Sequence, residues 1–218
     1  NGAMLWLVAG AKSGWGLAIV AGTGANCWGR DHEGRLGHTT GGAAVLGEYG
    51  GADTLVPEAV RAISRAFTHR GPATSLTDAF VHYAGADGVE DLLEGVCVDR
   101  YDVPTDAAPL IFEAADAGDE VALDLIRWAG RELGSLATGV ARQLSLEETA
   151  FEVVQIGSLF DVSPLLSETM LTEIHKAAPD ARLTRLQIPP VVGGVLLGME
   201  AGGLDVRSLR DSLGRDAA

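Results

Sequence analysis

Residues 16–35, GLAIVAGTGANCWGRDHEGR, carry the pattern from which the rest of the chain can be interpreted. A run of apolar residues, 17–21, leads directly into Gly-Thr-Gly, and a second short strand pattern follows it. The polar turn HEGR then predicts another reversal, because Gly34 occupies the position that hairpin turns favour for glycine. Residues 16–39 therefore predict antiparallel β-structure.

The tip of the first hairpin, Gly22-Thr23-Gly24, allows two interpretations. A dinucleotide-binding fingerprint needs a third glycine and a following helix, but Cys27 holds that place and a strand follows; the lysine-bearing P-loop pattern is also missing. Successive backbone N–H groups and a hydroxyl can still bind a phosphate. The alternative is an ordinary tight hairpin whose glycines supply positive φ, and the hairpin taken alone favours that alternative.

Composition limits the partners of this chain. It has 218 residues, 47% of them hydrophobic, which is enough for one large domain or a domain and a fraction. A formal net charge of −14 argues against nucleic acid and against anionic membrane surfaces. No secretory or membrane-spanning pattern is found, so we expect a cytoplasmic protein. The start at Asn1 in mid-pattern suggests a fragment of a longer protein.

The cysteines and histidines do not form a recognisable metal or redox pattern. Cys27 and Cys97 are far apart, and we expect two buried or partly buried free thiols. Cys27 is interpreted as a small packed thiol rather than a nucleophile, because no histidine is close to it in sequence. The five histidines show no ligand spacing, so no metal site is predicted.

The remaining chain divides into a helical part and an alternating part. From about residue 45 to 145 apolar residues recur at helical spacing, with Ser75 and Asp119 as expected helix starts. The last third reads strand, helix, strand, helix, with Ser163-Pro164 opening the first of these helices. This order predicts parallel neighbouring strands and an α/β domain.

Six segments in order carry a resemblance to a known family: AGTGANCWGRDHEG, GGAAVLGEYGG, RGPATSLTDAF, IFEAADAGDEVALDLIRWAGRELG, IGSLFDVSPLLSE and PPVVGGVLLGMEAGG. The chain resembles the C-terminal half of the actin–hexokinase–chaperone ATPase superfamily. The branch it resembles is that of N-acetylglucosamine kinase-like proteins, grouped with BadF/BadG-type ATPases. The resemblance implies a ribonuclease H-like α/β domain over 16–218 with a helical insertion at about 45–145. Residues 1–15 would then end an N-terminal domain.

By this resemblance the chain would be the nucleotide- and sugar-binding half of an ATP-dependent hexosamine kinase that uses Mg2+. Its partner would be a small sugar rather than nucleic acid or membrane, and a homodimer is compatible with it. The residues implied are Gly22, Thr23 and Gly24 for the phosphates of ATP; Gly130, Gly134, Gly157 and Ser158 for adenosine; and Asn26, Gly41, Gly42 and Glu48 for the sugar.

Several of these residues have structural alternatives. Gly130 and Gly134 fit close helix packing equally well. Gly193, Gly194 and Gly198 are expected to form an interdomain packing surface and are given no chemistry. Asn26 is also a common turn residue that bonds its own backbone. Glu48 is also typical of a solvated acid at a helix start.

The chain departs from the family pattern at three places. The tryptophan of the second loop is replaced by Gly42 or Ala43, and Asp-Glu-Gly-Ser has become Glu48-Tyr49-Gly50-Gly51. The aspartate that serves the family as catalytic base is replaced by Gly2. The family's first domain, with its Asp-x-Gly loop that organises magnesium, is not matched. The catalytic residue is therefore unassigned, and a radical-enzyme-activating ATPase or a non-catalytic sugar or nucleotide sensor stay as alternatives.

Overall fold

A five-stranded sheet in the order β3-β2-β1-β4-β5 organises the computed structural model, which describes residues 2–185, 190–204 and 206. The first three strands form an antiparallel meander, and β4 and β5 add to it in parallel, β4 beside β1. This arrangement confirms the predicted antiparallel start and the predicted α/β class. The strands are β1 (Gly16–Ala21), β2 (Ala25–Arg30), β3 (Leu36–His38), β4 (Glu152–Ile156) and β5 (Arg182–Arg185).

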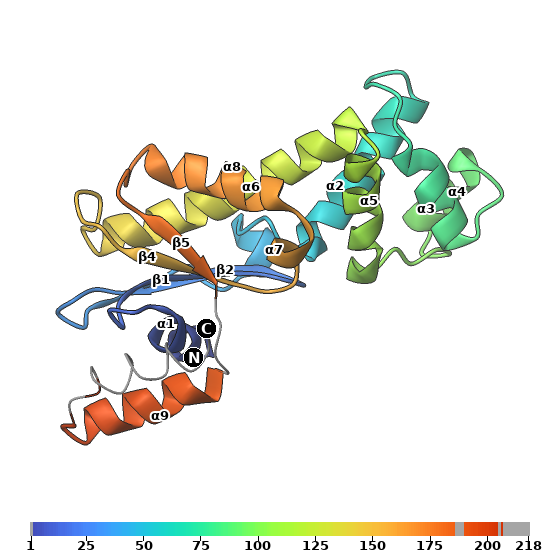
Figure 1. Cartoon of the computed structure of the whole chain (residues 1–218). Helices are drawn as coiled ribbons and strands as arrows, with labels where there is room; N and C mark the ends of the chain where they lie inside the picture. The colour runs from blue at the N-terminus through green and yellow to red at the C-terminus, as the bar shows by residue number, and fades with distance from the viewer. Residues whose placement is uncertain (1, 186–189, 205, 207–218) are drawn as a thin grey trace.

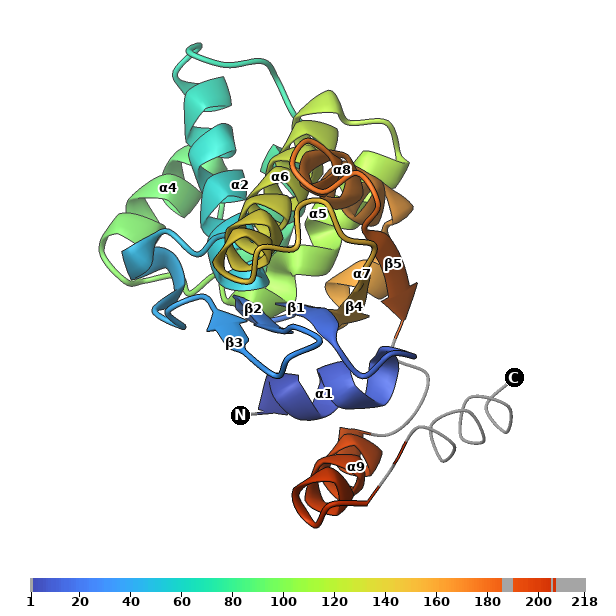
Figure 2. The ribbon, with the colours of Figure 1, turned by 90° about the vertical axis from the view of Figure 1, so that its left-hand side faces the viewer.

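Helices cover both faces of this sheet, which explains why β1 is almost fully apolar and buried. On one face lie α6 (Glu120–Gln143) and α8 (Pro164–His175), and on the other lie α1 (Gly2–Gly10) and α9 (Pro190–Ala201) (Figures 1 and 2). Gly193 of α9 lies so close to the Leu5 carbonyl that a Cβ would clash with it. That glycine therefore serves helix packing within this chain.

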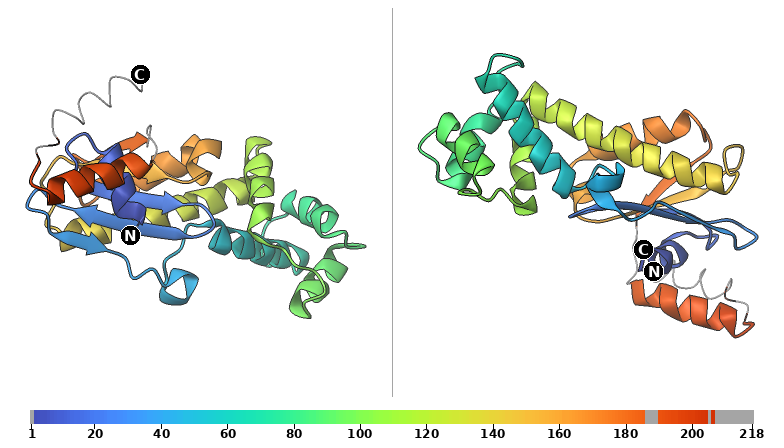
Figure 3. Two further views of the ribbon diagram at one scale, coloured as in Figure 1. Left: turned by 90° about the horizontal axis from the view of Figure 1, so that it is seen from below. Right: turned by 180° about the vertical axis from the view of Figure 1, so that it is seen from behind.

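The predicted helical part is present and extends beyond the end of the sheet (Figure 3). Asp119 caps α6 by accepting the Ala122 N–H, and it also accepts hydrogen bonds from the Ser75 N–H and the Thr74 hydroxyl. Ser75 is the N-cap position of α3, so both expected starts are confirmed. The elements are η1 (Ala43–Leu46), α2 (Ala52–Phe67), α3 (Leu76–Ala84), α4 (Val89–Cys97), η2 (Thr105–Ala107) and α5 (Ala108–Asp116).

The last third follows the predicted alternation, with one short addition. After β4 comes α7 (Leu159–Val162), and then α8 begins at Pro164 with Ser163 as N-cap, as expected. The second strand of this alternation, β5, precedes two prolines in the sequence, Pro189 and Pro190. It ends at Arg185, α9 begins at Pro190, and Pro189 lies outside the described residues.

The two cysteines differ in environment. Cys27 is buried in the core on β2, and burial raises the pKa of its thiol, so a packed thiol is confirmed. Cys97 is exposed, and the expectation that it would be at least partly buried is wrong. The reason is that α4 is peripheral and buries only Leu92 and Gly95 fully. In the part of the chain that the structure describes, no helix is both long and apolar enough to span a membrane.

Candidate functional site

The tip of the β1–β2 hairpin is held by the start of α2. The Ala52 N–H donates to the Gly22 carbonyl at 2.9 Å, and the Asp53 N–H donates to the Thr23 carbonyl at 2.8 Å. The N-cap of α2 is Gly51, which has no side chain to cap the helix, so the hairpin carbonyls accept these N–H groups instead. The partial positive charge of the α2 N-terminus therefore lies against the hairpin tip.

Two of the three amide groups at this tip, those of Thr23 and Gly24, are not used by the fold. Gly22 donates its N–H to the Gly24 carbonyl at 3.1 Å. Among the hydrogen bonds of the described residues, none is donated by the backbone N–H of Thr23 or Gly24. Two successive N–H groups without partners, beside a helix N-terminus, form the kind of site that binds an anion.

The geometry of the hairpin glycines separates the two interpretations of this tip. Neither Gly22 nor Gly24 has positive φ, so the expectation that the turn needs glycine for that reason is wrong. A Cβ on Gly22 would meet no atom within 4 Å, and one on Gly24 would only touch the Asp53 carboxylate at 3.5 Å. Gly51 differs, since its Cβ would lie 2.5 Å from the Gly24 Cα. The space beside Gly22 is therefore open rather than filled by packing.

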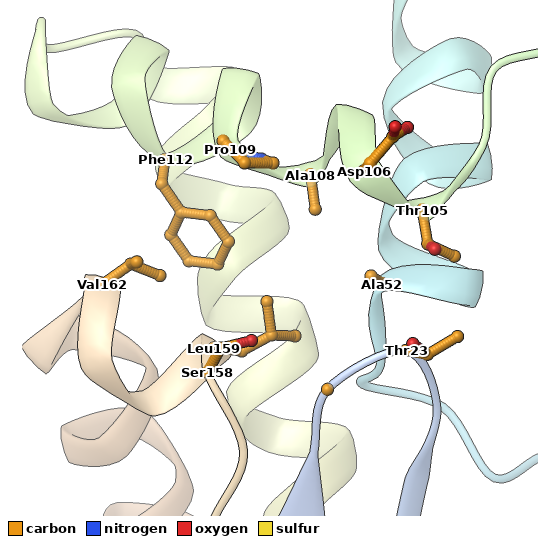
Figure 4. A pocket seen from close by; sticks show the side chains of 11 residues that line it. Thr23, Ala52, Thr105, Asp106, Ala108, Pro109, Phe112, Ser158, Leu159 and Val162 are labelled. Carbon is orange, nitrogen blue, oxygen red and sulfur yellow. The ribbon is translucent and has the colours of Figure 1, made fainter.

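A cavity of about 400 Å³ opens above this hairpin tip (Figure 4). Its walls come from four segments that are far apart in sequence: the hairpin, the start of α2, residues 105–112, and residues 158–162. The Phe112 ring and the Val162 side chain point into it, and Thr23 lies at its lower side. The lining is mostly apolar, with a few polar groups from Thr23, Thr105, Asp106 and Ser158, which is typical of a small-molecule site.

Ser158 lines this cavity, and Gly157 before it is glycine for a structural reason. Its φ is +110° and a Cβ there would clash with the Ala21 carbonyl. Gly157 is therefore required by the close approach of β4 to the end of β1. This places Ser158 directly after a fixed backbone position.

The structure corrects the adenosine role expected for Gly130 and Gly134. A Cβ on Gly130 would lie 2.7 Å from the Thr169 Cβ, and one on Gly134 would lie 2.5 Å from the Glu173 Cβ. Both glycines are buried against α8 and do not line the cavity. Helix packing, the alternative left open by the sequence, is the role that the contacts give them.

Three of the expected sugar residues, Gly41, Gly42 and Glu48, lie on the loop after β3, and this loop contacts the fourth, Asn26 on β2. The Thr39 hydroxyl donates to the Asn26 side-chain oxygen at 3.2 Å, and a Cβ on Gly41 would be 3.5 Å from the Asn26 nitrogen. The Glu48 Oε1 atom accepts hydrogen bonds from the Thr40 N–H, from the Thr40 hydroxyl at 2.7 Å and from the Gly41 N–H at 3.2 Å. Glu48 thus fixes the turn that brings Gly41 to Asn26.

Glu48 is not the solvated acid that its alternative interpretation predicted. Its residue is only 5% exposed. While Oε1 has three donors, Oε2 is buried and has no hydrogen-bond partner among the described residues. A carboxylate oxygen accepts only, so a water or a ligand hydroxyl is the kind of group that would satisfy this atom. Gly42, by contrast, uses its N–H within the loop, donating to the Thr40 hydroxyl at 3.3 Å.

Sequence reasoning missed the part of the cavity that comes from the helical segment. Thr105, Asp106 and Pro109 belong to none of the six resembling segments, Phe112 lies in one without a role assigned to it, and only the tertiary fold brings these residues to the hairpin. The Asp106 carboxylate accepts a hydrogen bond from the Tyr83 hydroxyl at 2.5 Å, which ties this wall to α3. Within the described ranges, no group of three or more His, Cys, Asp or Glu residues is placed to hold a metal ion.

Curated proteins similar to this chain are kinases of amino sugars. No protein-family model matches the chain. It is 28% identical over 210 residues to the N-acetyl-D-glucosamine kinase of Dictyostelium discoideum, covering 92% of this chain and 65% of that protein. It is 22% identical over 200 residues to the N-acetylmuramic acid/N-acetylglucosamine kinase of Clostridium acetobutylicum, covering 90% and 65%. The chain thus spans about 65% of the length of these relatives.

Solved structures establish the fold. A protein from Chromobacterium violaceum assigned as an N-acetylglucosamine kinase matches with a TM-score of 0.62 at 21% identity, covering 90% of this chain and 63% of that one. The ROK family glucokinase from Streptomyces griseus, solved with glucose and AMPPNP, matches with a TM-score of 0.53 at 17% identity, covering 88% and 64%. The chain has the actin-like ATPase fold of sugar kinases, as expected.

Proposed function

We propose that this chain is the ATP- and sugar-binding part of a kinase that phosphorylates N-acetylglucosamine or a closely related amino sugar. The observation that carries the proposal is the hairpin tip, where Thr23 and Gly24 offer unpaired N–H groups and Gly22 leaves open space. The similarity to two amino-sugar kinases supports the substrate class, and the glucokinase solved with AMPPNP supports ATP.

In this proposal the phosphates of ATP lie on the N–H groups of Thr23 and Gly24. The nucleoside lies against the apolar wall of Phe112 and Leu159, with Ser158 as a hydrogen-bond partner. Mg2+ would accompany ATP, since this ion is bound largely by phosphate oxygens, waters and one or two carboxylates.

The sugar lies beside Asn26 and Glu48. Each sugar hydroxyl donates and accepts, so the Asn26 amide and the unpaired Glu48 Oε2 suit it. Glu48 Oε2 is also the acceptor we assign to the proton that the attacking hydroxyl loses. Phosphoryl transfer depends mostly on positioning and electrostatics, which the hairpin amides and the α2 N-terminus supply on this side.

The test is sugar-dependent ADP formation by the full-length protein with N-acetylglucosamine, N-acetylmuramic acid and glucose. Glu48→Gln keeps an oxygen for the three donors of Oε1 but removes the acceptor at Oε2. We expect it to lower the turnover rate at least about hundredfold without changing the melting temperature. Glu148→Gln, an exposed change, is the control. A protein that binds neither ATP nor sugar in calorimetry contradicts the proposal.

A second candidate, a sensor that binds both ligands without turnover, is favoured by Gly2 at the place where the family has its aspartate. Calorimetric binding of ATP and sugar without any ADP formation would support the sensor and contradict the kinase. For the radical-enzyme activator, no observation adds support: Cys27 is buried in the sheet and Cys97 lies at the end of α4.

A further inference from the structure

A second cavity, of about 480 Å³, is lined by residues of both α2 and α6, two helices that Figure 3 shows side by side. It is separated from the nucleotide cavity by the first turn of α2, because Ala52 lines one cavity and Asp53 lines the other. The other lining residues that bear on its ligand are Tyr49, Trp128, Glu58 and Arg61. None of these residues takes part in the function proposed above.

Asp53 gives this cavity an unsatisfied acceptor. Its Oδ1 atom is buried and has no hydrogen-bond partner among the described residues. Burial raises the pKa of the Asp53 carboxyl, and the Thr54 N–H opposes this shift. A buried acceptor without a donor is costly, so a ligand that donates a hydrogen bond there gains more than it would at an exposed carboxylate.

The cations of the described residues do not satisfy Asp53. Arg61 also lines the cavity, but its guanidinium pairs with Glu58 at 2.5 Å. Two carboxylates and one guanidinium leave this cavity with a net negative charge. A ligand with a positively charged group would therefore balance the charge of this cavity.

An aromatic wall faces the same space. The rings of Tyr49 and Trp128 contact each other with centroids 5.9 Å apart and planes tilted by 37°. Both side chains are only partly buried, so they leave ring surface facing the cavity. Aromatic faces attract cations and pack well against a carbon framework.

We propose that this second cavity binds a small organic molecule carrying a protonated amine, with the ammonium donating to the Asp53 carboxylate and the carbon framework lying on Tyr49 and Trp128. The site adjoins the phosphate hairpin, because the Asp53 N–H is the group that holds the Thr23 carbonyl. It takes a ligand of its own, distinct from ATP and sugar.

The experiment compares two probes of nearly the same shape, benzylamine and benzyl alcohol, by calorimetry on the full-length protein at pH 7. We expect benzylamine to bind at least about tenfold more tightly, because only it supplies a charged donor. Asp53→Asn is expected to remove this difference. Asp78→Asn, the same change at an exposed first-turn position of α3, is the matched control and keeps it.

Two further variants keep the proposal falsifiable if Asp53→Asn does not fold. Trp128→Leu removes one ring and is expected to weaken benzylamine binding about fivefold. Asn26→Ala changes only the proposed sugar site and leaves benzylamine binding intact, which separates the two proposals. Equal affinity for both probes overturns the inference. So does a natively melting Asp53→Asn variant, or a folded Trp128→Leu variant, that binds benzylamine like the wild type.

Discussion

The proposed function depends on two glycines, Gly22 and Gly2, for opposite reasons. At Gly22 the absence of a side chain leaves space that the fold does not fill. At Gly2 the absence of a side chain removes a carboxylate that the resemblance leads us to expect. A Cβ on Gly2 would also meet no atom within 4 Å, so the structure accommodates a larger residue at either place.

Gly22→Ala tests the phosphate site directly. The added methyl group enters the space beside the hairpin, so we expect ATP affinity to fall about tenfold or more. The melting temperature stays equal or rises slightly, because alanine restricts the unfolded chain. Calorimetry and thermal unfolding measure the two effects. Gly139→Ala, at an exposed position of α6 with open space around it, is the matched control. Equal ATP affinity in both variants would show that the hairpin has only a structural role.

Gly2→Asp tests the missing carboxylate. If the protein is a slow kinase, an aspartate here accepts the proton of the attacking sugar hydroxyl, and single-turnover phosphoryl transfer rises about hundredfold. Sugar affinity changes little, and an acid in the first turn of α1 suits the helix dipole. A wild type that already turns over rapidly, with no gain from aspartate, shows that another residue is the base. That result would agree with Glu48 as the acceptor of this proton, as proposed above.

At the scale of elements, the turn between β2 and β3 depends on one buried carboxylate. Asp31 is 1% exposed and accepts hydrogen bonds from the Glu33 N–H at 3.0 Å, the Arg35 N–H at 2.8 Å and the Arg35 Nε at 2.5 Å. Burial by itself raises the pKa of Asp31, but the hydrogen bonds and charge of Arg35 outweigh burial, and the net pKa is lowered.

A lowered folded-state pKa predicts how stability depends on pH. The contribution of Asp31 is fully present above its unfolded pKa of about 3.9 and is lost as pH falls through the lower folded value. Asp31→Asn should therefore lower the free energy of unfolding at pH 7 and flatten its fall below about pH 4. Urea unfolding over a pH series measures this. Asp116→Asn, at the exposed end of α5, should leave the pH profile unchanged; a parallel profile for Asp31→Asn would refute the assignment.

At the scale of the whole molecule, the net negative charge of the protein repels the proposed ligand ATP. The chain carries a formal net charge of −14, and ATP is an anion. Local amides hold the phosphates, but the long-range field repels the approaching nucleotide. We expect the association rate of MgATP to rise about twofold to fivefold between low and physiological ionic strength, since salt screens this repulsion. Stopped-flow measurements with neutral N-acetylglucosamine, whose rate should not change, provide the comparison.

The sequence predicted what local patterns determine. The antiparallel start, the helical middle and the parallel end follow from apolar periodicity, and α6 begins after Asp119 because this side chain caps the helix locally. Ser75 and Ser163 hold the N-cap positions of α3 and α8 without a capping side-chain hydrogen bond. The order of elements then leads to the α/β class. Each of these features depends on residues close together in the chain.

The candidate site was predictable only in part. Thr23 and Ser158 line the same cavity, but Phe112 forms part of its wall although no role was predicted for this residue from the sequence. Gly130 and Gly134 were equally compatible with a ligand and with α8, and only the packing of α8 decides between them. The burial of Glu48 depends on the whole loop after β3. Long-range packing, which periodicity does not contain, accounts for these differences.

The pairing of β1 with β4 has a consequence for the making of the protein. These central neighbours join residues 16–20 to residues 152–156, with the entire helical segment made between them. During synthesis the edge of β1 that pairs with β4 therefore stays unpaired while more than a hundred further residues are made. Unpaired strand edges of this kind invite aggregation, so the nascent chain should depend on a chaperone until β4 appears.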